Sequence, residues 1–239
     1  MHRFLAILIG ALFVLTGYAF AEESASEEAK TDEQKLKELM YDPDEAKLET
    51  IMKEAAAKED WLGAIPKIEK LISDGVGKGE FADDSILCEE MKREKFHCLI
   101  LGGKLDEAKK FAENISSVKE EIEKGKEYYS EANVTVLEAG LLGKYGFVKK
   151  SEEKLDKFLK KSGISKEDKQ KVLFCKAIVN YRANNDYEKF LKLLEETQAA
   201  DPESKIGQLV SMQITAVKQI IEQQKEAEKE AKKEEKENK

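Results

Sequence analysis

Residues 173–194 read LFCKAIVNYRANNDYEKFLKLL, and this stretch decides the fold. Apolar side chains recur every three or four residues as far as Tyr181, which is the spacing of one face of an α-helix. Asn184, Asn185 and Asp186 then interrupt the pattern, and such polar residues favour tight turns and helix starts. Because the helical spacing resumes at Tyr187, the stretch predicts two helices joined by a tight turn.

The same arrangement occurs four times along the chain. In each copy a bulky residue follows the turn and opens the second helix of a pair, and successive copies lie 44, 42 and 40 residues apart; these residues are Trp61, Leu105, Phe147 and Tyr187. A helix pair leaves an apolar face that only the next pair can cover, so a repeat of this length indicates stacked pairs. We therefore predict an all-α, right-handed helical-repeat solenoid of about four helix pairs over residues 42–221, without strands.

Two further segments complete the predicted repeat domain. Residues 73–84 (SDGVGKGEFADD) contain three glycines and predict the most pronounced loop. Asp201-Pro202 predicts the start of a last helix that runs to Ile221 and caps the stack, since it has no partner helix of its own. Residues 222–239 are rich in Glu and Lys and predict a helical, coiled-coil-like or frayed tail.

The N-terminus resembles a secretion signal. Residues 4–14 (FLAILIGALFV) are uncharged and apolar, and the small residues of Ala19-Phe20-Ala21 predict cleavage after Ala21. Retention of residues 1–21 as a membrane anchor is the alternative, but the run is short for a span of about 20 residues. We expect a periplasmic or secreted protein that begins at Glu22, with an acidic disordered leader over residues 22–41.

Charge and cysteine content restrict the class of partner. The chain has 41 basic and 49 acidic residues, a net charge of −8, which argues against nucleic acid and against anionic membrane surfaces. Cys88 and Cys98 fall on one predicted helix, about 15 Å apart, too far for a disulfide. We expect the three cysteines, the third being Cys175, to be buried free thiols, with a bridge from Cys175 as the alternative.

The turn residues resemble those of the tetratricopeptide repeat (TPR). The fourth pair matches best, through Tyr181, the turn Asn185-Asp186-Tyr187, and Pro202 after the pair. Residues 103–108 (GKLDEA) match the turn and the following small residue in the second pair, as Asp60-Trp61 with Ala64 do in the first.

The chain also departs from that family. Lys150 in the third pair and Phe190 in the fourth replace the small residue, and the period exceeds the family's length of about 34 residues. The resemblance implies stacked helix pairs whose first helices line a concave groove, and it says little about function.

We find no pattern typical of a catalytic, cofactor or metal site. His97 is the only histidine after the predicted cleavage, and its neighbour Cys98 points about 100° away on a helix. The cysteines and His97 lack the spacing of zinc ligands. We therefore expect no enzyme activity, no metal and no cofactor. Asn114 and Asn133 begin glycosylation sequons, which matter only in a eukaryotic secretory pathway.

The arginines suggest where a partner binds. Only Arg93 and Arg182 remain after cleavage, both on the first helix of a pair, and arginine can bind carboxylates through two parallel hydrogen bonds. The candidate groove residues are Arg93, His97, Cys175, Val179 and Arg182. The alternative is that both arginines are ordinary surface residues.

These observations favour an exported, non-catalytic scaffold that binds a protein or peptide through its helical-repeat groove. A self-associating structural or envelope-organising protein, a homo-oligomer formed through the last helix, is the second hypothesis. An unrecognised enzyme is the third.

Overall fold

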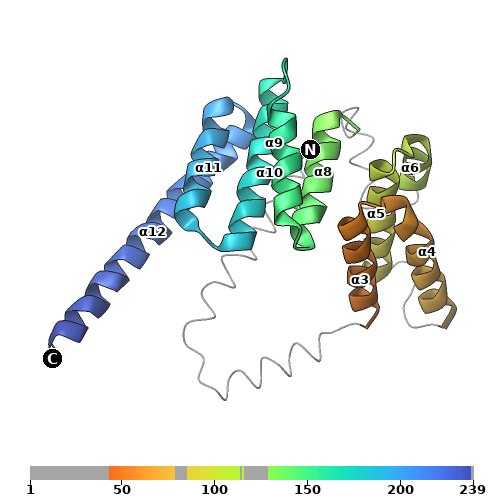
Figure 1. Ribbon diagram of the computed structural model, residues 1–239, viewed down its shortest axis with the longest axis horizontal. Coiled ribbons are helices and arrows are strands. Elements are labelled where there is room, and N and C mark those ends of the chain that lie inside the picture. The colour runs from red at the N-terminus through yellow and green to blue at the C-terminus, as the bar shows by residue number, and fades with distance from the viewer. Residues whose placement is uncertain (1–42, 79–84, 114, 116–128, 238–239) are drawn as a thin grey trace. The chain divides into compact units, whose positions relative to one another are not determined.

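The computed structural model of the chain describes residues 43–78, 85–113, 115 and 129–237; the side chains of Lys78, of residue 228 and of residues 230–237 are not described. Within these ranges the chain forms nine helices and no strand, which confirms the predicted all-α class (Figure 1). The predicted signal peptide (residues 1–21) and acidic leader (22–41), as well as Asn114, lie outside the described residues. The chain divides into two compact units, up to Tyr129 and from Ser130, which are described separately.

The first unit begins with a helix pair, α3 (Pro43–Lys58) and α4 (Trp61–Lys78). The turn between them has Glu59 at φ 54°, and the Gly63 amide donates a hydrogen bond to Asp60 Oδ1 at 3.0 Å. This contact makes Asp60 the cap of α4, because a carboxylate that accepts from the third residue of a helix fixes where the helix starts.

A second pair follows, made of α5 (Ile86–Leu101) and the short α6 (Leu105–Ala112). Ser85 caps α5 by accepting a hydrogen bond from the Cys88 amide at 3.2 Å. Helix α5 packs against both α4 and α6, and the core of the unit lies between these helices. The largest fully buried side chains here are Met52, Ile68, Met91, Phe96 and Ile115.

The predicted loop over residues 73–84 is wrong for its first half. Helix α4 continues through Gly75 and Gly77 to Lys78, and residues 79–84 lie outside the described part of the chain. A glycine costs a helix only about 1 kcal/mol relative to alanine. Continued backbone hydrogen bonding and the burial of Gly75 outweigh that cost here.

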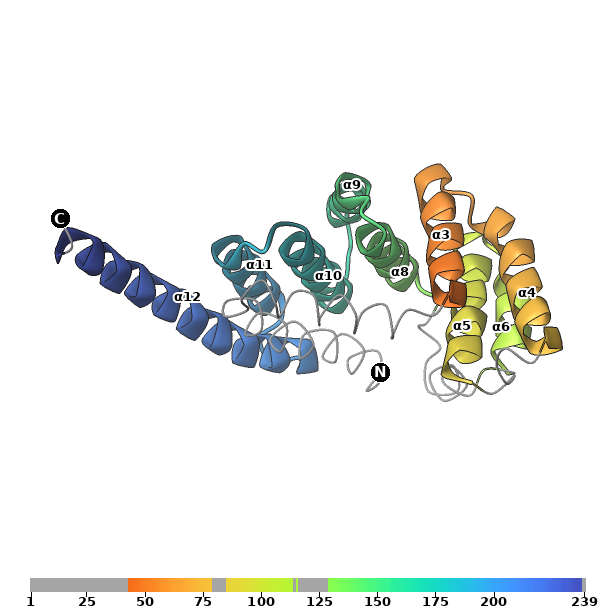
Figure 2. The same cartoon turned by 90° about the horizontal axis from the view of Figure 1, so that it is seen from below.

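The second unit contains the helices α8 (Glu131–Lys144), α9 (Val148–Leu159), α10 (Lys166–Asn184), α11 (Tyr187–Ala200) and α12 (Lys205–Glu237). Helix α10 packs against α8, α9 and α11, and Figure 2 shows it between α8 and α11. The turn from α10 to α11 passes through Asn185 at φ 49°, as its polar sequence predicts. The Tyr181 ring stacks on Phe190 across this turn with centroids 4.6 Å apart.

The last helix starts later than predicted. Helix α12 begins at Lys205 rather than at Asp201-Pro202, because Ser204 is its cap: Ser204 Oγ accepts a hydrogen bond from the Gly207 amide at 2.9 Å. Helix α12 packs along α11, and its apolar residues Val210, Ile214 and Val217 are buried.

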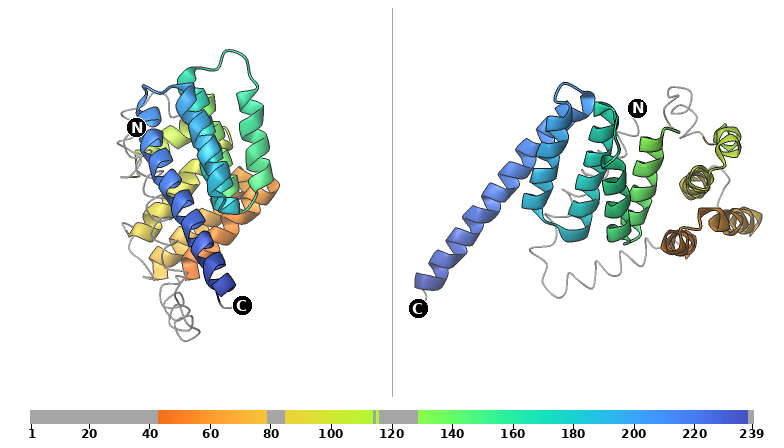
Figure 3. Two further views of the ribbon diagram at one scale, coloured as in Figure 1. Left: turned by 90° about the vertical axis from the view of Figure 1, so that its left-hand side faces the viewer. Right: turned by 45° about the horizontal axis from the view of Figure 1, so that its top comes forward.

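Helix α12 continues through the Glu/Lys-rich segment to Glu237, and its C-terminal part runs away from α11 (Figure 3). The segment from residue 222 to residue 237 is therefore helical, as predicted.

The side chain of Gln170 joins the end of α11 and the start of α12 to α10. Gln170 is fully buried, and its Nε2 donates hydrogen bonds to the carbonyl oxygens of Thr197 at 3.1 Å and Asp201 at 2.7 Å. Its Oε1 accepts a hydrogen bond from Ser204 Oγ. One amide thus satisfies backbone and cap groups on both sides of the turn.

Candidate binding surfaces

Helix α5 carries Arg93 and His97 one turn apart, so the two side chains share a face. Both are half-buried. His97 Nδ1 lies 3.2 Å from Oε2 of Glu94, whose side chain is only 5 % exposed. The site on α5 therefore combines a guanidinium with an imidazole that is already engaged by a buried carboxylate.

Helix α10 carries Cys175, Val179 and Arg182, but the first two do not face solvent. Cys175 is 6 % exposed and its Sγ donates to the Val136 carbonyl oxygen of α8 at 3.7 Å. Val179 is 5 % exposed and packs on Gly143 of α8, where an added Cβ would lie 2.9 Å from Val179 Cγ2. In this structure neither side chain can contact a bound peptide without rearrangement of the α8–α10 packing.

All three cysteines are free and buried, which confirms the prediction of unpaired thiols. Burial raises the pKa of the Cys98 thiol to about 12, and the nearby Glu94 carboxylate adds to this effect. Burial also raises the pKa of Cys175 to about 12, against the charge of Arg182, which lowers it. Because the thiolate is the reactive form, Cys98 and Cys175 act as packing residues at neutral pH.

Arg182 is exposed in the last turn of α10. A cation at this position is stabilised by the negative end of the helix dipole. Arg93 and His97 belong to the first compact unit, and Cys175, Val179 and Arg182 belong to the second.

Many of the surface lysines are already paired with carboxylates. Examples from the two units are Lys67–Glu54 at 2.7 Å and Lys176–Asp156 at 2.6 Å, although other lysines, such as Lys53 and Lys192, have no partner in the described chain. Over the ranges that the structure describes, neither Arg93 nor Arg182 forms a hydrogen bond or an ion pair. The two side chains best suited to bind a carboxylate from another molecule are thus the two that no carboxylate of the described chain occupies.

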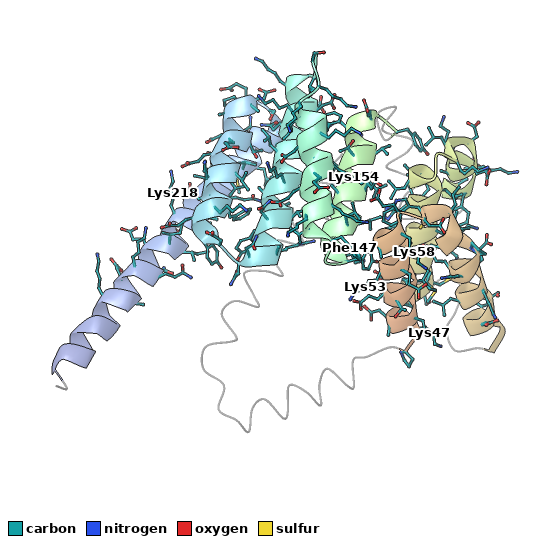
Figure 4. All side chains as sticks on the ribbon, viewed as in Figure 1. Lys47, Lys53, Lys58, Phe147, Lys154 and Lys218 are labelled. Atoms are coloured by element: carbon teal, nitrogen blue, oxygen red, sulfur yellow. The ribbon has the colours of Figure 1, made fainter. Side chains whose placement is uncertain are left out.

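A shallow cleft of about 500 Å³ lies between α3 and α4 and was not predicted from the sequence. The apolar side chains of Ile51 and Leu71 in its lining are half-buried and its lysines are exposed; Figure 4 labels one of these lysines, Lys47, near the start of α3. The cleft is lined by Ala46, Lys47, Thr50, Ile51, Lys67, Lys70, Leu71 and Asp74.

The sequence gives little indication that these residues line a cleft. Ile51 and Leu71 fit the helical apolar spacing of their helices, so both are expected in the core rather than on a surface. The lysines are part of a set of 41 basic residues, and no spacing distinguishes them from the rest. Only the packing of α3 on α4 brings these side chains together.

Within the described ranges, no three His, Cys, Asp or Glu side chains lie close enough together to hold a metal ion. None of the helices in that part of the chain is both long enough and apolar enough to cross a membrane. Comparisons with protein-family models, with curated proteins and with solved structures give no match for this chain.

Proposed function

We propose that this protein is an exported, non-catalytic scaffold with TPR-like stacked helix pairs, and that it binds a protein or peptide through carboxylate contacts. The observation that carries the proposal is the absence of any hydrogen-bonding or ionic partner for Arg93 and Arg182 within the described chain. Arginine offers five N–H donors in a planar fork, which matches a carboxylate better than a lysine ammonium does. An acidic side chain or a C-terminal carboxylate is the ligand group that fits.

The arrangement of the helices supports the same proposal. Tight turns join α3 to α4 and α10 to α11, and α8 packs against both α9 and α10, as stacked pairs require. Both arginines lie on the first helix of a pair, α5 and α10. In stacked helix pairs the repeated first helices supply an extended binding surface.

The test is capture of the partner in the native envelope. The tagged protein is cross-linked in cells and the captured proteins are identified by mass spectrometry. We expect one dominant partner, lost in the Arg93→Ala/Arg182→Ala variant and retained in Lys53→Ala/Lys192→Ala. The control removes the same charge, one residue from each unit, at exposed lysines that also lack a partner in the described chain.

Circular dichroism must show the same helix content in both variants, because Arg93 is half-buried. Capture that is unchanged in the arginine variant contradicts the proposal. Capture that is lost equally in the lysine control shows that general charge, and not the guanidinium fork, holds the partner.

One observation favours self-association as the second candidate. Lys225 on α12 pairs with Glu188 in the first turn of α11 at 2.9 Å, and α12 continues for twelve residues beyond Lys225. An isolated helix of about 12 residues is marginal in water, so a partner for this extension would stabilise it. Light scattering of the protein with and without residues 222–239 tests whether the protein self-associates through this segment. A monomer in both cases would contradict self-association.

A further inference from the structure

We draw no further inference here: the strongest candidate, the cleft between α3 and α4, has lysines that carboxylates of the chain itself offset, and nothing in the described part of the chain shows what covers its apolar lining.

Discussion

The helix pairs α3–α4 and α10–α11 have the same design and differ in how completely they are covered. Phe174 of α10 and Leu194 of α11 are buried to 1 % and 0 % exposure, and α12 lies along the outer side of α11. Ile51 of α3 and Leu71 of α4 remain half-buried at the floor of an open cleft. A helix pair cannot bury both of its faces by itself, so the apolar residues become fully buried where a further described helix packs on them and stay half-buried where no described helix does.

Removal of a buried aromatic ring from the α10–α11 pair should have the largest effect on stability. Phe174→Ala leaves a cavity on α10, and we expect the free energy of unfolding of the second unit to fall by about 3–5 kcal/mol. Urea unfolding followed by circular dichroism measures this loss. Trp61, the single tryptophan, lies in the first unit, so its fluorescence reports that unit separately. A cost below about 1 kcal/mol would mean that the pair is not packed as described.

A change to the Gln170 contact should have an intermediate effect. Gln170→Ala removes the partner of two backbone carbonyl groups and of the Ser204 cap, so we expect a loss of about 1–3 kcal/mol. Hydrogen exchange should become faster in the first turns of α12. Gln208→Ala is the control, because the exposed side chain of Gln208 donates one hydrogen bond, to the Glu203 carbonyl oxygen at 3.3 Å. Unchanged exchange in the Gln170 variant would show that α12 is held by its contact with α11 alone.

The sequence predicts the local features of this fold well. The predicted first residues of three second helices, Trp61, Leu105 and Tyr187, are the first residues of α4, α6 and α11, and Phe147 directly precedes α9. Turns and caps depend on a few neighbouring residues, which is why a single sequence suffices to locate them. The loop predicted over residues 73–84 is wrong for residues 73–78, because α4 retains Gly75 and Gly77 within the helix.

The candidate sites were harder to predict because they depend on packing between helices. Counting along α10 places Cys175, Val179 and Arg182 on one face, but the close approach of α8 at Gly143 buries the first two and leaves Arg182 exposed. The buried amide of Gln170 has no signal in the sequence, since its three partners lie 27 to 34 residues away. The α3–α4 cleft likewise exists only once two helices meet.

The smallest effect on stability is expected for a substitution in the α3–α4 cleft, and this substitution most directly tests the difference between the two helix pairs. Leu71→Ala removes a side chain that is only half-buried, so the free energy of unfolding should fall by less than about 1 kcal/mol, whereas a fully buried leucine loses about 2–5. Urea unfolding followed by Trp61 fluorescence measures the change in the first unit. If the loss instead exceeds about 2 kcal/mol, Leu71 is buried by chain outside residues 43–78, 85–113 and 115, and the cleft is an occupied part of the core.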